Sequence, residues 1–445
     1  MQIIISGAGE IGLYLAKMLI KENHNVTLID INDTIIKEID ASYDLMTVSG
    51  DCTTFSVLKS VKIHNADLYI AVTNSQDTNI LSCIFAKKLG AKKTVARVDD
   101  MEYLNPINKL TFINLGIDKM IYPELLAAKE IVGVIKQTGT TEVFEFSGGK
   151  LTLFVIKLDE NSPVLNLSLI EASKLTKNKN FRAVAIKRLD KTIIPKGKDI
   201  LKENDLVYII SSPDGVKDLL KLLGKEKLDI NNVMFLGGSR ISMKVSKFIS
   251  QQLNVKIIES DPEKCLKLVE MLPNTMIIHG NGRNTELLLE SGLEKCDAFV
   301  AVTGDSETNL ITCILAKRYG VKQTFAEIEN LDYIDIASKM GIDTIINKKL
   351  ITASAIYTQT MKAEVTSIKC LTGTDAEVLE FVVSKDAIIS QNRLKDIHLP
   401  EGVIIGGVVR AKKSFIALGD TQIKAKDRVV LFALPEAIHK IEYFF

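Results

Sequence analysis

The chain opens with Gln2-Ile3-Ile4-Ile5-Ser6-Gly7-Ala8-Gly9-Glu10-Ile11-Gly12, a short apolar run that leads into a Gly-x-Gly-x-x-Gly loop. The three glycines have separate roles, since Gly7 permits a tight turn out of a strand, Gly9 lets the backbone approach a pyrophosphate, and Gly12 lets a helix pack closely on the sheet. A helix beginning here would offer phosphates its unpaired N–H groups and the positive end of its dipole. We therefore predict a dinucleotide-binding opening that contacts its ligand through Gly7, Ala8, Gly9, Glu10, Ile11 and Gly12.

An acidic residue, Asp30, ends the next predicted strand, Asn25–Asp30. A carboxylate at this point of a βαβ unit accepts hydrogen bonds from ribose hydroxyls and repels a 2′-phosphate. This favours an unphosphorylated adenosine ligand, NAD(H) or an adenine nucleotide, over NADP(H). The alternative interpretation is a Rossmann unit that binds no ligand, in which Asp30 is a solvated turn residue.

Apolar strands alternate with helical patterns through the rest of the first quarter of the chain. Further strands are expected at residues 45–49, 66–73, 94–98 and 119–122. One of the helices, over residues 77–90, ends on the C-cap glycine Gly90. Six strands alternating with helices are typical of a doubly wound parallel sheet, so we predict an α/β fold of the Rossmann type.

Several of these strands end on polar residues, and in open α/β sheets ligand groups collect at the carboxyl ends of strands. The further candidates for nucleotide contact are Asp51, Cys52, Thr73 and Arg97. Asp51 follows Gly50 in a turn, where it either touches the adenosine or only caps the helix predicted through residues 53–58. Thr73 lies beside the point where the strand order reverses.

Arg97 interrupts an otherwise apolar strand, so its guanidinium group needs a partner. A phosphate would accept charge-assisted hydrogen bonds from it, worth about 1.5–3 kcal/mol. A salt bridge with Asp99 or Asp100 is the alternative, and the sequence leaves both open.

The pattern of the first half returns in the second half, which determines the domain organisation. Ala71-Val72-Thr73 recurs as Ala301-Val302-Thr303, and Asp77-Thr78-Asn79 recurs at the same offset as Glu307-Thr308-Asn309. A turn-rich α+β module of short strands follows each Rossmann pattern. The chain is therefore predicted to hold two copies of a two-domain unit, with domains at residues 1–123, 140–224, 230–352 and 365–445.

The second copy departs from the first where a ligand would bind. Its loop is Gly237-Gly238-Ser239-Arg240-Ile241-Ser242, with serines in place of the second and third glycines. Glu259 replaces the ribose-binding aspartate, and Glu327 replaces Arg97. A Cβ atom at Ser239 would crowd a pyrophosphate and Glu327 would repel it. Glu259 is the candidate contact of this half, where we expect weaker, altered or absent nucleotide binding.

Composition excludes several other classes of protein. There are 56 Lys and Arg against 55 Asp and Glu, a balance that disfavours nucleic-acid binding. No apolar stretch approaches the ~18–20 residues that span a bilayer, and the opening lacks the layout of a signal peptide. The six cysteines and five histidines show no metal-ligand spacing, so we expect reduced, buried cysteines and no metal site. No nucleophile motif appears, and no catalytic residue is predicted.

Four features of the chain resemble the RCK domains that regulate potassium conductance. They are the loop with Asp30, the Gly50-Asp51 turn, the repeated Ala-Val-Thr segments, and the trailing module with Ile193-Ile194-Pro195-Lys196-Gly197 and Asp205-Leu206-Val207-Tyr208. The tandem arrangement resembles the regulatory subunits of bacterial Trk potassium uptake systems. The resemblance implies a non-enzymatic gating subunit with NAD(H) and ATP or ADP as ligands. It also implies a homotetrameric ring on the cytoplasmic face of the inner (plasma) membrane, docked on a Trk-type potassium-translocating subunit.

Two other functions remain open at this point. A soluble NAD-dependent oxidoreductase would need a substrate domain and an acid/base group aimed at the nicotinamide, and the sequence offers neither. A nucleotide sensor acting on some other partner would share every feature of the loop.

Overall fold

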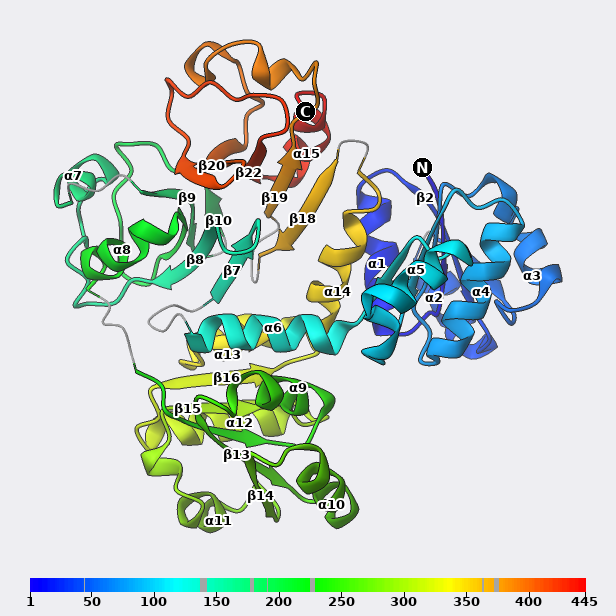
Figure 1. Ribbon diagram of the computed structural model, residues 1–445, viewed down its shortest axis with the longest axis horizontal. Helices are drawn as coiled ribbons and strands as arrows, with labels where there is room; N and C mark the ends of the chain where they lie inside the picture. Colours follow the sequence, from blue (N-terminus) through cyan, green and yellow to red (C-terminus); the bar gives the residue numbers. More distant parts are fainter. Residues whose placement is uncertain are drawn as a thin grey trace. The chain divides into compact units, whose positions relative to one another are not determined.

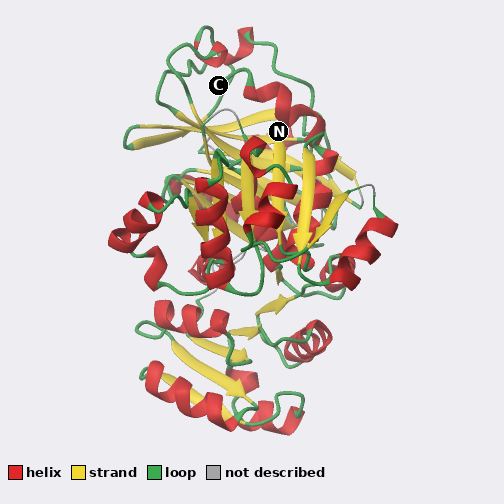
Figure 2. Ribbon diagram, turned by 90° about the vertical axis from the view of Figure 1, so that its right-hand side faces the viewer, coloured by secondary structure: helices red, strands yellow, loops and turns green. Residues whose placement is uncertain are grey.

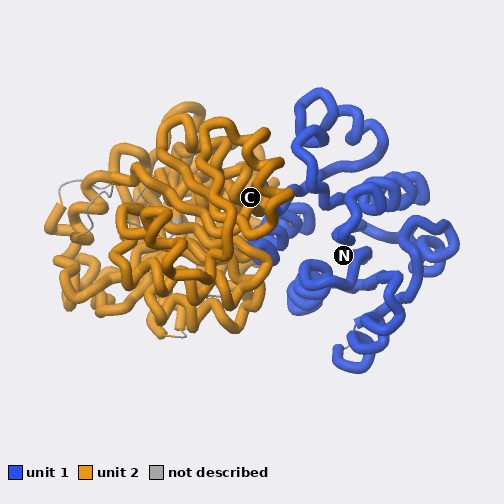
Figure 3. Tube along the Cα trace, turned by 90° about the horizontal axis from the view of Figure 1, so that it is seen from below, with its two compact units in different colours: residues 1–126, 348–360 blue, residues 127–347, 361–445 orange. Residues whose placement is uncertain are grey.

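The computed structural model describes residues 1–43, 45–136, 142–176, 180–189, 191–224, 229–361, 364–371 and 376–445. The chain forms two compact units, residues 1–126 with 348–360 and residues 127–347 with 361–445 (Figure 3). The predicted domain start at residue 140 lies outside the described residues. The ranges of the four predicted domains remain a prediction.

The first Rossmann sheet has the strand order β3-β2-β1-β4-β5-β6, with parallel pairing throughout. Its strands are β1 Gln2–Ser6, β2 Asn25–Asp30, β3 Met46–Ser49, β4 Leu68–Ala71, β5 Lys93–Arg97 and β6 Lys119–Ile121. Its helices are α1 Glu10–Lys21, α2 Asp33–Ser42, α3 Phe55–Ser60, α4 Gln76–Lys88 and α5 Pro106–Asn114. Ile3, Ile4 and Ile5 of the central strand are fully buried, as expected for a sheet covered on both faces.

A helix from the second half of the chain completes this unit. Helix α14, Lys348–Tyr357, packs against α1 and β6 (Figure 1). It is buried over most of its length, with Ala353, Ile356 and Tyr357 at 0–1% exposure. The first Rossmann unit is therefore built from two segments that lie far apart in the sequence.

The second Rossmann sheet repeats the same order, β14-β13-β12-β15-β16-β17, again with parallel pairing. The strands are β12 Asn232–Leu236, β13 Asn254–Glu259, β14 Thr275–His279, β15 Ala298–Ala301, β16 Gln323–Glu327 and β17 Thr344–Ile346. The helices are α9 Arg240–Ile249, α10 Pro262–Met271, α11 Thr285–Glu290, α12 Ser306–Arg318 and α13 Asp332–Lys339, and they flank the strands on both faces (Figure 2). The α/β fold class, with its duplication, is confirmed.

Each Rossmann pattern is followed by a small antiparallel sheet. The first has the order β10-β9-β11-β8-β7, and α6, Pro123–Lys136, leads into it. Its elements are β7 Glu142–Phe146, β8 Leu151–Lys157, α7 Leu169–Lys174, β9 Phe181–Arg188, β10 Lys191–Ile193, β11 Leu206–Ser211 and α8 Val216–Leu222. The second has the order β18-β19-β22-β20-β21. Its elements are β18 Val365–Cys370, β19 Glu377–Val382, β20 Val403–Arg410, β21 Lys413–Ile416, β22 Arg428–Ala433 and α15 Pro435–Glu442.

The repeated aspartate of the small sheets is a buried carboxylate that pairs with a partly exposed arginine in each copy. Asp205 accepts hydrogen bonds from Arg188 Nε (2.8 Å) and from Arg188 Nη2 (2.7 Å). Asp427 accepts from Arg410 in the same way, at 2.9 and 2.7 Å. Both carboxylates are almost fully buried and also accept a backbone N–H, so they remain paired as buried charges must. The aspartate is therefore repeated in the sequence because it has the same structural role in both small sheets.

Candidate functional site

The glycines of the first loop serve different purposes in the structure. Gly7 adopts φ +101°, and a Cβ atom there would lie 2.8 Å from the backbone nitrogen of Thr73. A Cβ atom at Gly12 would lie 1.8 Å from the carbonyl oxygen of Gly7, so α1 can start this close to β1 only with glycine. A Cβ atom at Gly9 would meet nothing within 4 Å. Gly7 and Gly12 thus shape the loop, whereas Gly9 borders open space.

The N-terminus of α1 has no side-chain cap. Gly9 is the N-cap residue, and as a glycine it offers no oxygen to the first N–H groups of the helix. Glu10 and Ile11 follow in the first turn, where Glu10 is exposed and Ile11 half-buried. Uncapped N–H groups and the helix dipole favour an anion here, so the arrangement fits the phosphates of a nucleotide.

Asp30 is tied to this loop by its carboxylate. Oδ2 accepts the N–H of Ala8 at 2.6 Å, and Oδ1 accepts the N–H of Asn32 at 2.8 Å. Each carboxylate oxygen has a second lone pair, so Asp30 can hold the loop and still accept a ribose hydroxyl. The predicted ribose contact is therefore also a positioning residue of the phosphate loop.

Asp51 and Cys52 lie at the end of β3. Asp51 Oδ1 accepts the N–H (2.8 Å) and the hydroxyl (2.7 Å) of Thr53, and these bonds lower the pKa of Asp51. The carboxylate thus shapes the turn before α3 and stays ionised. Cys52 is buried in the core, and burial raises the pKa of its thiol. All five cysteines whose side chains are described are free and buried.

Asn79 joins the carboxyl ends of two strands. Its side-chain oxygen accepts the N–H (2.8 Å) and the hydroxyl (2.7 Å) of Thr73, at the end of β4. Its amide nitrogen donates to the carbonyl oxygens of Thr73 (3.1 Å) and of Arg97 (3.0 Å), at the end of β5. The candidates Thr73 and Arg97 are therefore brought together by a residue that was not itself predicted as a site residue. The repeated Thr-Asn pair was the signal that could have found it.

The ion pair shown for Arg97 is with Glu124, at 3.7 Å, and both side chains are largely buried. Glu124 belongs to the first turn of α6, so the partner differs from the two nearby aspartates that the sequence suggested. The separation of the two groups is longer than a strong charge-assisted hydrogen bond. Arg97 therefore has a protein partner that an incoming phosphate would have to compete with.

In the second copy, the helix N-terminus caps itself. Ser239 occupies the position of Gly9, and its hydroxyl oxygen accepts the N–H of Ser242 at 3.3 Å. The hydroxyl of Ser242, which occupies the position of Gly12, donates to the carbonyl oxygen of Ser239 at 2.8 Å. One N–H group that a phosphate would use is thus already satisfied.

Glu259 repeats the structural part of the Asp30 arrangement. It accepts the N–H groups of Gly238 (2.8 Å), Ser260 (2.7 Å) and Asp261 (2.9 Å). Burial acts to raise the pKa of this carboxyl, but the three N–H groups outweigh it and the pKa is lowered. Glu259 is therefore a buried carboxylate that holds the second loop.

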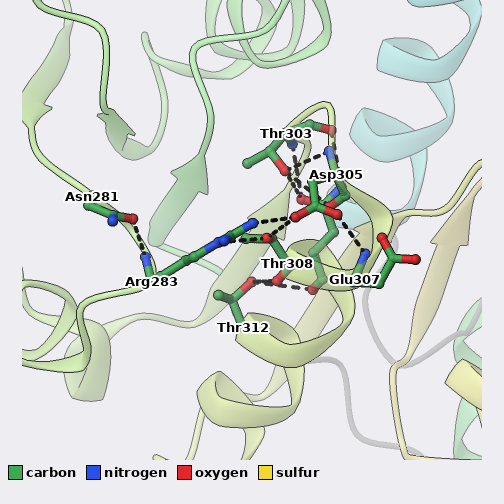
Figure 4. Close-up of polar contacts among 8 residues, drawn as sticks. Asn281, Arg283, Thr303, Asp305, Glu307, Thr308 and Thr312 are labelled. Carbon is green, nitrogen blue, oxygen red and sulfur yellow. Dashed lines mark hydrogen bonds and ion pairs between the residues drawn. The ribbon is translucent and has the colours of Figure 1, made fainter.

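A cavity of about 460 Å³ opens at the second loop, between Glu259, Lys264, Asn281 and Asp305. Arg283 lines it and is held in place by α12 and the turn before it (Figure 4). Its Nε donates to Thr308 Oγ1 at 2.9 Å, and its Nη2 forms an ion pair with Asp305. The hydrogen bond from Thr308 and the nearby charge of Arg283 lower the pKa of Asp305 to about 2. Sequence reasoning missed this pair, because the first copy has Thr53 and Ser75 at the equivalent positions.

Two kinds of feature are absent from the described ranges. None of the helices there is long and apolar enough to cross a membrane. Within the same ranges, no group of three or more His, Cys, Asp or Glu side chains is placed to hold a metal ion.

Comparisons with known proteins agree with this architecture. The TrkA-N domain model matches residues 3–123 and 233–348, and the TrkA-C domain model matches residues 153–224 and 378–445. The Trk system potassium uptake protein TrkA of Halomonas elongata is 31% identical over the whole of this chain and 98% of its own length. A TrkA homolog of Archaeoglobus fulgidus is 32% identical over the full length of both chains.

Among solved structures, the GsuK RCK domain has a TM-score of 0.62 at 14% identity, over 99% of this chain and 94% of that one. The GsuK channel bound to NAD has a TM-score of 0.63 at 15% identity, over 100% of this chain and 78% of that one. These likenesses show the fold, a tandem of RCK-like domains. With the sequence relatives beside them, the chain belongs to the family of the Trk system potassium uptake protein TrkA.

Proposed function

We propose that the chain is a cytoplasmic regulatory subunit of a Trk-type potassium uptake system and that a nucleotide bound at the first loop is its signal. The relatives are named for potassium uptake, and none of those reported above is named as an enzyme. In this proposal four chains form a ring, peripheral on the membrane, and dock on the potassium-translocating subunit.

The observation that supports nucleotide binding most directly is the uncapped N-terminus of α1 beside Asp30. NAD(H), ATP and ADP share the adenosine and phosphate groups that these elements suit. The second loop, with its self-capping Ser239, is proposed to bind more weakly or to prefer another ligand.

The free energy needed to shift the gate sets how much differential binding each site must supply. Shifting a two-state gate from 1:99 to 99:1 requires about 5.5 kcal/mol of differential binding. Four first-loop sites in a ring would each supply about 1.4 kcal/mol, a tenfold preference for one ring state. Ligands that differ by one phosphate or one charge can differ by this amount in their preference for one ring state. A ligand with equal affinity for both states would gate nothing.

Calorimetry with NAD⁺, NADH, ATP and ADP tests the binding step on wild type, Asp30→Ala and Glu259→Ala. The two variants are matched, because each removes a carboxylate that accepts a loop N–H. We expect Asp30→Ala to abolish tight binding and Glu259→Ala to leave it unchanged. Equal losses in both variants would contradict the assignment of the signal to the first loop.

The gating step needs a second measurement. Small-angle scattering of the purified protein should show a change in ring dimensions between two of these nucleotides. Potassium flux through the membrane subunit in proteoliposomes should change with the same pair. A ring that keeps one shape with every nucleotide would rule out gating by this route.

A further inference from the structure

An ion pair joins the first phosphate loop to the helix contributed by the second half of the chain. Lys349 Nζ lies 3.1 Å from Glu10 Oε2, within the unit formed by residues 1–126 and 348–360. Lys349 lies in the first turn of α14, which packs on α1 (Figure 1). Glu10 is the first residue of α1, directly after the uncapped Gly9.

The two partners are unequally exposed. The side chain of Lys349 is 12% exposed, whereas that of Glu10 is 68% exposed. The lysine stem is therefore held by packing and its ammonium group has a fixed place, while the glutamate can turn toward solvent at little cost. A largely buried ammonium group is stabilised by an anionic partner, which Glu10 provides in this structure.

We propose that Lys349 senses the phosphate charge of the nucleotide at the first loop, with the ligand phosphate replacing Glu10 as its partner. The inference rests on the proposed function, because it takes the first loop as the nucleotide site. The exchange is favourable only for ligands whose phosphates reach the lysine with at least the charge of a carboxylate. Affinity therefore rises with the number of phosphate charges, and occupancy changes the contact between α1 and α14.

The second copy shows that the pair is specific to the first. The position of Glu10 is taken by Arg240 in the second loop, so no carboxylate stands there to pair with a lysine. Charge sensing of this kind is therefore a property of the first site.

The proposal is tested by calorimetry with adenosine, AMP, ADP and ATP on wild type, Lys349→Met, Glu10→Gln and the double variant. In Lys349→Met we expect the affinity for ATP to fall about tenfold, with little change for adenosine. Glu10→Gln should bind ATP a few-fold more tightly, because the competing carboxylate is gone. That gain should disappear in the double variant, since it acts through the lysine.

Lys17→Met is the matched control, because it also replaces a lysine by methionine, but at a position on α1 two turns away from the loop. There Lys17 donates a hydrogen bond to Tyr43. It should keep the wild-type ratio of ATP to adenosine affinity, as should Lys349→Arg, which retains the charge. If Lys349→Met does not fold, Glu10→Gln and Lys349→Arg still decide the question. An unchanged ATP to adenosine ratio in Lys349→Met, or no gain in Glu10→Gln, overturns the inference and leaves the proposed function intact. Absence of any nucleotide binding by wild type overturns both.

Discussion

At the scale of single residues, Gly9 is expected to matter for ligand binding and Gly12 for the stability of the fold. Gly9→Ser would give α1 the self-capping hydroxyl that Ser239 gives α9. We expect this variant to bind ATP at least tenfold more weakly, because one N–H is satisfied and the open space is filled. Its stability should not fall, since a serine N-cap stabilises a helix at least as well as glycine. Calorimetry and urea unfolding measure the two effects.

Gly12→Ala provides the contrast. Its Cβ atom would lie 1.8 Å from the carbonyl oxygen of Gly7, a backbone atom that cannot turn away. We expect a loss of stability of about 1–3 kcal/mol or more, as for overpacked cores, together with weaker binding. A Gly9→Ser variant that unfolds as readily as Gly12→Ala would contradict this division of roles.

At the scale of elements, the buried asparagines Asn79 and Asn309 connect adjacent strand ends in each Rossmann sheet. Asn309 repeats the bonds of Asn79: it accepts from Thr303 and donates to the carbonyl oxygens of Thr303 (3.2 Å) and Glu327 (2.9 Å). An alanine would leave buried backbone groups unpaired, at about 1–3 kcal/mol for each. We therefore expect Asn79→Ala and Asn309→Ala each to destabilise its own sheet by at least about 2 kcal/mol.

Hydrogen exchange is the measurement that separates the two sheets. Asn79→Ala should raise exchange in β4 and β5, and Asn309→Ala in β15 and β16. The reciprocal sheet is the internal control in each case. Equal protection in wild type and both variants would show that these side chains do not hold the strand ends.

Part of the fold and of the candidate site could be predicted from the sequence alone. The glycine loop, the alternation of strands and helices, and the constant offset between repeated segments were enough for the fold class and its duplication. The geometry of the loop was predictable because glycine has a narrow set of uses there. The partner of Arg97 and the network of Asn79 were not, because these residues meet only where the strand ends and α6 come together in the folded sheet, which spacing along the chain does not record.

At the scale of the whole molecule, the two small sheets share one core. Phe146, Leu151 and Tyr208 of the first belong to the same buried cluster as Val378 and Phe432 of the second. A Cβ atom at Gly406 in the second would lie 2.1 Å from a methyl group of Ile210 in the first. The repeats are therefore not independent modules, and the second half is needed to complete the first in two separate places.

This dependence predicts the behaviour of a chain cut after Gly224. The fragment 1–224 keeps the first loop and Asp30 but loses α14, which buries Ile356 and Tyr357, and it loses the cluster partners of Phe146. Each large apolar side chain taken from water contributes about 1.5–3 kcal/mol, so the fragment should be several kcal/mol less stable than its part of the full chain. Co-expression with residues 229–445 should restore the urea midpoint and, through Lys349, the affinity for ATP. A fragment that alone matches the full chain in both measurements would contradict the dependence, because neither α14 nor the shared core could then contribute to the first half.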